Sequence, residues 1–250
     1  METEMKVNTF EADEVKSLQM DIAAAIVKTR EAAGGEIRVE AKNLQEGRYT
    51  CELESGKLVI AYKMKGGMHF RSSLHEETQI VLYLPADQVL EHVTLEIGAG
   101  EMSMDAVPVS CSKMKVEIGA GKWKAAQLTV SGRLKVEIGA GKAKMKDVTA
   151  GRVDIDCGVG SCVYKGRING DVKVDCGVGN CSFELENKES DFNYDVSCAM
   201  GRIRINDNKM RSLAAKKVCK NEKVLGTAVL ECGLGSIEWV TDEVGINATK

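Results

Sequence analysis

Two short cysteine-containing units are the residues of this sequence best suited to chemistry. "DCGVGSC" from Asp156 and "DCGVGNC" from Asp175 lie 19 residues apart, and each places a Gly-x-Gly between two cysteines. Paired thiols at short spacing can ligate zinc or form a redox couple, and a glycine-rich turn can hold a phosphate when it opens a helix. In a third interpretation the thiols fill a core and the glycines form corners. The elements that carry these units decide between the three.

The units belong to an internal repeat with a period near 20 residues. Apolar and polar residues alternate in each copy, as in "LKVEIGAGKAKM" from Leu134, which indicates two short strands that meet at a Gly-x-Gly corner. Successive copies are 21, 20, 19, 19, 22 and 34 residues apart, and an eighth, weaker copy starts at Ser17. The residue before each corner marks the phase of the seven clear copies: Ile97, Ile118, Ile138, Cys157, Cys176, Cys198 and Cys232.

A fixed repeat of this length predicts an all-β protein, a parallel β-solenoid of about seven to eight coils. We expect a strand-rich capping region over residues 1–90, because the end of a solenoid exposes unpaired backbone. The solenoid itself is predicted over 91–241, with an insertion near 206–226, and a tail over 242–250.

The repeat also accounts for the cysteines and the glycines. In aligned copies, cysteine occupies positions that other copies fill with Ile, Met, Ala or Trp. A metal ligand would not be replaced by such side chains, whereas a buried thiol packs as a small hydrophobe. Every Gly-x-Gly precedes a strand and not a helix, so no phosphate loop, metal or cofactor is expected. Six cysteines are therefore assigned to the core: Cys157, Cys162, Cys176, Cys181, Cys198 and Cys232.

Composition and the first residues limit the partners and the compartment. The net charge is −3 and aromatic residues make up 4%, which gives neither a basic footprint nor stacking platforms for nucleic acid. The start, "METEMKVNTFEADEVK", lacks the apolar segment of a signal peptide, and no apolar run approaches the roughly 20 residues of a membrane span. We expect a cytoplasmic protein with reduced thiols, associated with an envelope only through a partner.

Two outward surfaces are candidate sites. A basic patch of Lys122, Lys124, Lys142 and Lys144 could meet an anionic polymer, an acidic lipid surface or an acidic partner. For both surfaces the simpler interpretation is a charged face that keeps the sheet soluble. His69 and His75, in a polar loop, form a weaker candidate metal pair. The second surface is an acidic face that could bind a cation or a substrate: Asp154, Asp156 and Asp175.

The segment "IVLYLPAD" (80–87), followed by copies of "VEIGAGKxK", resembles the bacterial family of putative adhesins of unknown function, over roughly residues 15–240. The resemblance implies a β-solenoid from cell-envelope and envelope-stress gene sets. We therefore expect a non-catalytic scaffold or binding protein whose partner is an unknown protein or an anionic polymer or surface. The alternative is a polysaccharide lyase or hydrolase of the pectin-degrading β-helix type, using the acidic face and Lys173. Homo-oligomerisation through a solenoid end is a third hypothesis.

Overall fold

The computed structural model describes residues 5–63, 77–210, 215–219 and 223–242. In these residues the chain forms 21 strands and two 3-10 turns, so the prediction of an all-β protein is confirmed. The turns are η1 (Ala12–Glu14) and η2 (Glu189–Asp191). The strands are β1 (Lys6–Glu11), β2 (Ser17–Ile22), β3 (Ile26–Glu31), β4 (Glu36–Lys42), β5 (Tyr49–Glu54), β6 (Lys57–Tyr62), β7 (Gln79–Leu84), β8 (Val89–Ile97), β9 (Glu101–Met104), β10 (Val109–Ile118), β11 (Lys122–Ile138), β12 (Lys142–Cys157), β13 (Ser161–Ile168), β14 (Val172–Cys176), β15 (Asn180–Leu185), β16 (Phe192–Cys198), β17 (Arg202–Ile205), β18 (Asn208–Met210), β19 (Ala215–Cys219), β20 (Gly226–Cys232) and β21 (Ser236–Thr241).

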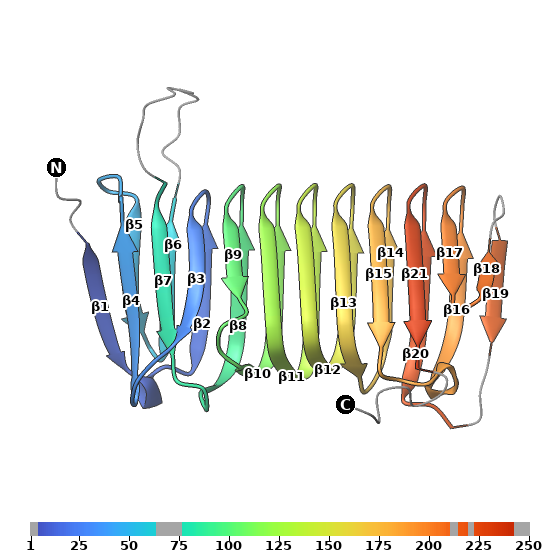
Figure 1. Ribbon diagram of the computed structural model, residues 1–250, viewed down its shortest axis with the longest axis horizontal. Coiled ribbons are helices and arrows are strands. Elements are labelled where there is room, and N and C mark those ends of the chain that lie inside the picture. Colours follow the sequence, from blue (N-terminus) through green and yellow to red (C-terminus); the bar gives the residue numbers. More distant parts are fainter. Residues whose placement is uncertain (1–4, 64–76, 211–214, 220–222, 243–250) are drawn as a thin grey trace.

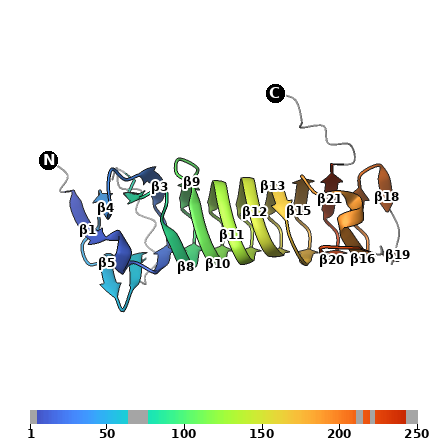
Figure 2. The ribbon, with the colours of Figure 1, turned by 90° about the horizontal axis from the view of Figure 1, so that it is seen from below.

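The central strands form a stack of coils, where a coil is the pair of strands joined at one Gly-x-Gly corner. Figure 1 shows these corners side by side along one edge of an elongated molecule, and Figure 2 shows the same stack from below. The strand that precedes each corner pairs in parallel with its equivalent in the next coil, as Ile118 does with Ile138. The strand that follows the corner does the same, as Lys122 does with Lys142. Side chains of one type of position therefore form columns along the stack.

Two coils lie out of sequence order. The last coil, β20 and β21, lies between β14–β15 and β16–β17, where Figure 1 shows it in red. At the other end, β2 and β3 lie between β6–β7 and β8–β9. The weak copy that begins at Ser17 is thus a full member of the stack, with Ile22 in register with Ile97.

Both ends of the stack carry antiparallel strands. At the N-terminal end β4 pairs with β1 and β7, and β5 pairs with β6 around a turn in which Ser55 and Gly56 have φ of 50° and 81°. At the other end β19 pairs with β16 and β18 pairs with β17. The sheet is therefore mixed: the predicted parallel pairing holds along the central stack, and antiparallel strands at both ends pair with backbone groups that a parallel coil would leave unpaired.

The core is built from the inward columns. Cys157 pairs with Cys176, Cys176 with Cys232, and Cys232 with Cys198, all buried. The side chain before each corner packs under the second glycine of the next corner. A Cβ at Gly179 would lie 2.9 Å from the Cys157 sulfur, closer than a Cβ is normally found to another heavy atom. The repeated Gly-x-Gly therefore exists because stacked corners leave no room for a side chain.

Candidate functional site

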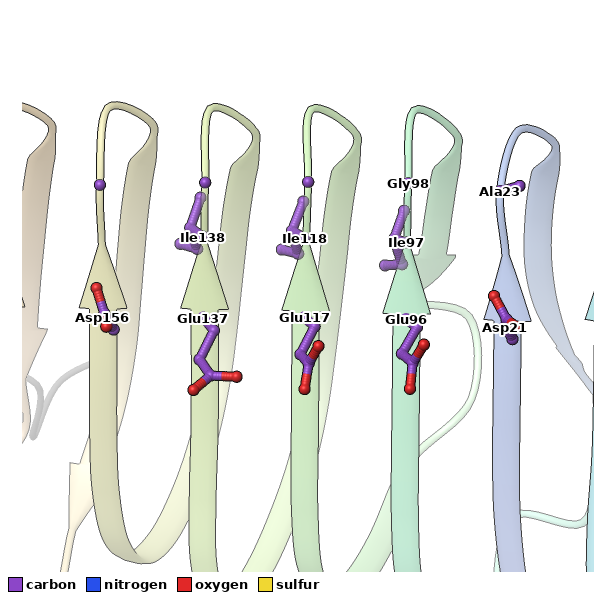
Figure 3. A pocket seen from close by; sticks show the side chains of 13 residues that line it. Asp21, Ala23, Glu96, Ile97, Gly98, Glu117, Ile118, Glu137, Ile138 and Asp156 are labelled. Atoms are coloured by element: carbon purple, nitrogen blue, oxygen red, sulfur yellow. The ribbon is translucent and has the colours of Figure 1, made fainter. Parts of the chain in front are cut away.

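A row of carboxylates runs along the outer face of the strands that precede the corners. Seven adjacent strands each supply one member in register, so neighbours are separated by about one strand spacing, ~4.8 Å. Figure 3 shows the part of this row from Asp21 to Asp156 in line on neighbouring strands. This acidic row consists of Asp21, Glu96, Glu117, Glu137, Asp156, Asp175 and Glu231.

A groove of about 660 Å³ accompanies the acidic row from Asp21 to Asp156. The corners also line the groove, where Gly98, Gly119 and Gly139 place backbone without side chains. The glycines are required by the stacking, since a Cβ at Gly139 would lie 3.0 Å from the carbonyl oxygen of Gly119. The groove is thus a consequence of the repeat, and it is open to an extended ligand that lies along the stack.

Lysines of the neighbouring column compensate only the centre of the acidic row. Lys115 contacts Glu117 and lies 3.7 Å from Glu137, and Lys135 lies 2.5 Å from Glu137. The hydrogen bond from Lys135 lowers the pKa of Glu137, and the hydrogen bond to Glu117 raises the pKa of Lys115. These exposed pairs contribute little to stability. In the described part of the chain, no Lys, Arg or His forms an ion pair with the other five members of the row.

Asp154 does not belong to the acidic row. It lies in the lysine column, in register with Lys135 and Lys173, and it is 6% exposed. Arg133 contacts its carboxylate through Nε, and the Nε of Arg152 lies 3.3 Å from Oδ1. The structure places Asp156 beside Asp175 and Asp154 on the same face of the strand, and Arg133 and Arg152 hold the Asp154 carboxylate.

The predicted basic patch lies on the outer face of the strands that follow the corners. Lys122 pairs in register with Lys142, and Lys124 with Lys144, so the four lysines do come together. Glu101, in the preceding coil, lies 3.8 Å from Lys122 and 3.1 Å from Lys124, and the hydrogen bond from Lys124 lowers its pKa. In the described residues Lys142 and Lys144 have no carboxylate partner. A single carboxylate, Glu101, therefore offsets part of the charge at one end of the patch.

The cysteines lie inside the protein and away from both faces. The six core cysteines are buried and form no disulfide. Hydrogen bonds from Cys176 and Cys181 favour the thiolate of Cys157 and lower its pKa, and burial raises the pKa of Cys232 to about 11. Among the described residues, no group of three or more His, Cys, Asp or Glu is arranged to hold a metal ion. His69 and His75 lie outside the described residues.

Two members of the acidic row were missed by sequence reasoning. Asp21 could have been found, because it occupies the same position in the weak copy from Ser17 as Glu96 does in the first clear copy. Glu231 could not have been found as the neighbour of Asp175, because the next copy in the sequence after that of Asp175 carries Ser197 at this position. Only the inserted position of β20 places Glu231, and not Ser197, beside Asp175.

Most of the chain matches a known family model. The model named Toastrack DUF4097 covers residues 15–224. The chain belongs to this family. No curated protein matches this Toastrack chain. In the described residues, no helix of this family member has the length and apolarity to cross a membrane.

Several solved structures resemble this Toastrack protein at low sequence identity. A putative adhesin from Bacteroides fragilis is 13% identical, with a TM-score of 0.49 over 96% of this chain and 97% of its own. A putative lipid binding protein from Parabacteroides distasonis is 11% identical, with a TM-score of 0.47 over 95% and 96%. A putative cell adhesion protein from Clostridium sporogenes is 13% identical, with a TM-score of 0.41 over 96% and 100%. All three TM-scores lie below 0.5, so the family assignment rests on the family model alone.

Proposed function

We propose that the protein is a non-catalytic β-solenoid scaffold that binds an extended, charged partner lengthwise along its strand faces. One observation carries the proposal: seven carboxylates stand in register on seven adjacent strands, and a groove follows five of them. Such an array offers the same contact repeatedly at one spacing, which suits a long ligand better than a small substrate.

The charge of the acidic row defines the partner as cationic. Asp156 and Asp175 are exposed neighbours, and Glu96 is exposed near the other end of the groove. Repeated like charges at strand spacing repel one another, so an extended polypeptide segment rich in Lys or Arg would relieve that repulsion on binding. Attachment to a cell envelope through such a partner belongs to the same proposal.

The basic patch supports a second candidate partner, an anionic polymer or surface. Lys142 and Lys144 lie beside Lys122 and Lys124 on the outer face of the strands that follow the corners. Within the described ranges, Glu101 forms ion pairs only with Lys122 and Lys124. The geometry gives less support to a polysaccharide lyase or hydrolase that uses Asp154, because Arg133 and Arg152 already hold this carboxylate.

The test is a fluorescence anisotropy titration of a labelled decalysine peptide with the full chain. The triple variant Glu96→Gln, Asp156→Asn, Asp175→Asn removes three charges from the row. If each exposed pair contributes about 0.5 kcal/mol, the affinity falls about tenfold. A matched control, Glu31→Gln, Glu36→Gln, Glu46→Gln, removes three exposed carboxylates outside the row.

The two variants have the same net charge, so a general attraction would weaken binding equally in both. Equal losses, or no loss in the row variant, would refute the proposal. A labelled decaglutamate peptide tests the second candidate, with Lys142→Gln, Lys144→Gln as the variant that should weaken its binding.

A further inference from the structure

A second groove, of about 220 Å³, lies on the same face as the acidic row, further from the corners. It spans three neighbouring strands, β8, β10 and β11, each of which supplies two outward side chains. Lys113 is in register with His92, and Lys115 is in register with both Thr94 and Lys135. The outward side chains that line this basic groove are His92, Thr94, Lys113, Lys115, Arg133 and Lys135, and the buried Val93 and Met114 complete its lining.

Some of the positively charged side chains of the basic groove already contact a carboxylate, and others do not. Lys115 and Lys135 contact Glu117 and Glu137 of the acidic row, and Arg133 uses its Nε on Asp154. In the part of the chain that the structure describes, no carboxylate forms an ion pair with Lys113. Lys113 is exposed and lies on the strand next to that of Arg133.

The donors that remain converge from three strands. Lys113 offers three N–H groups, and Arg133 carries four N–H groups besides its Nε–H. Thr94 adds a hydroxyl, and His92 an imidazole. None of the eight lining residues carries a carboxylate side chain. A group with several acceptor oxygens pointing in different directions would satisfy this set, because the donors come from three neighbouring strands.

We propose that the basic groove binds a phosphate or sulfate group, centred between Lys113 and Arg133. The volume admits one such group, either as the free ion or as the ester end of a larger molecule. The site takes the opposite charge to the acidic row, and it does not depend on the function proposed above. One face of the protein thus carries two parallel recognition sites of opposite sign.

The experiment is an amide-resolved NMR titration of the full chain with sodium phosphate, against sodium chloride at equal ionic strength. Phosphate should shift the amides of Val93, Met114 and Leu134 saturably, and chloride should not. In Lys113→Gln the phosphate affinity should fall about fivefold, the loss of one charge-assisted contact at an exposed site. The matched control Lys146→Gln removes an exposed lysine whose ion pair is with Asp147, and the affinity should not change.

Two further arms complete the test. Thr94→Val removes a neutral hydrogen-bond donor without changing the charge, and the affinity of this variant for phosphate should also fall. Glycerol 3-phosphate should bind at least as tightly as inorganic phosphate if the natural ligand is an ester, and less tightly if it is the free ion. Equal shifts with chloride, or equal phosphate affinity in wild type and Lys113→Gln, would overturn the proposal.

Discussion

Replacing the second glycine of a central corner should destabilise the protein far more than replacing an exposed glycine. Gly160 closes the corner of the coil formed by β12 and β13. A Cβ at this position would overlap the carbonyl oxygen of Gly141 and would lie 2.6 Å from Cγ2 of Ile138. Gly35, in contrast, has no heavy atom within 4 Å of a Cβ built on it.

The magnitude follows from the room that is missing. The separation from Ile138 must open from 2.6 Å to the 3.4 Å of ordinary contact, and the backbone of Gly141 must move as well. Overpacking of a well-packed core costs about 1–3 kcal/mol, and a clash with backbone belongs at the upper end. For a chain of 250 residues, about 3 kcal/mol lowers Tm by roughly 6–12 °C.

Thermal and urea unfolding, followed by circular dichroism, measure the effect in three variants. Gly160→Ala should show the large loss and Gly35→Ala a change within about 0.5 kcal/mol. Gly139→Ala should fall between them, because its Cβ would lie 3.0 Å from the Gly119 oxygen. If Gly160→Ala is no less stable than Gly139→Ala, the close approach of stacked corners is not what requires glycine.

Three other predictions test the packing. Asp154→Ala should cost about 1 kcal/mol in urea unfolding, because Arg133 and Arg152 lose their shared partner, whereas Asp156→Ala should cost little. Burial raises the pKa of Cys111 from 9.0 to about 12, so the folded state holds this proton more tightly than the unfolded state. The stability that this pKa shift contributes is fully present below about pH 9 and is lost progressively as the pH rises from about 9 to about 12. Over this range the urea midpoint of the wild type should therefore fall more than that of Cys111→Val. A chain that ends at residue 225 lacks the coil between β14 and β16, so hydrogen exchange should show protection lost in β16 and β17 and kept in β10 to β12; unchanged protection in β16 would contradict the inserted order.

Much of the fold was readable because it depends on local rules. The alternation of "LKVEIGAGKAKM" fixes which side chains point inward, and the stacking of corners restricts two positions to small residues. The register of Cys157 with Cys176 follows from the 19-residue step alone. Five members of the acidic row, Glu96 to Asp175, follow from the same alignment of consecutive copies.

Asp154 shows where that reasoning stops. The alternation in the sequence places Asp154 and Asp156 on the outer face, and the strand register agrees with this for both residues. The arginine partners of Asp154, however, lie beside an irregularity, where the pairing of β11 with β12 shifts register between Val130 and Arg133. The direction of an arginine side chain at such an irregularity is decided by packing, and no periodic pattern encodes it.

The sequence by itself determined the all-β class, the repeat, the inward columns and the glycine corners, since strand alternation and steric exclusion act within one or two copies. Only the tertiary structure decided the order of the coils. Each copy offers nearly the same backbone edge, so backbone pairing alone does not distinguish one order of coils from another. The placement of Cys232 between Cys176 and Cys198, and with it Glu231 in the acidic row, depends on contacts between residues 34 to 56 positions apart. Those long-range contacts, and the antiparallel strands that close both ends, select one order among many that the repeat allows.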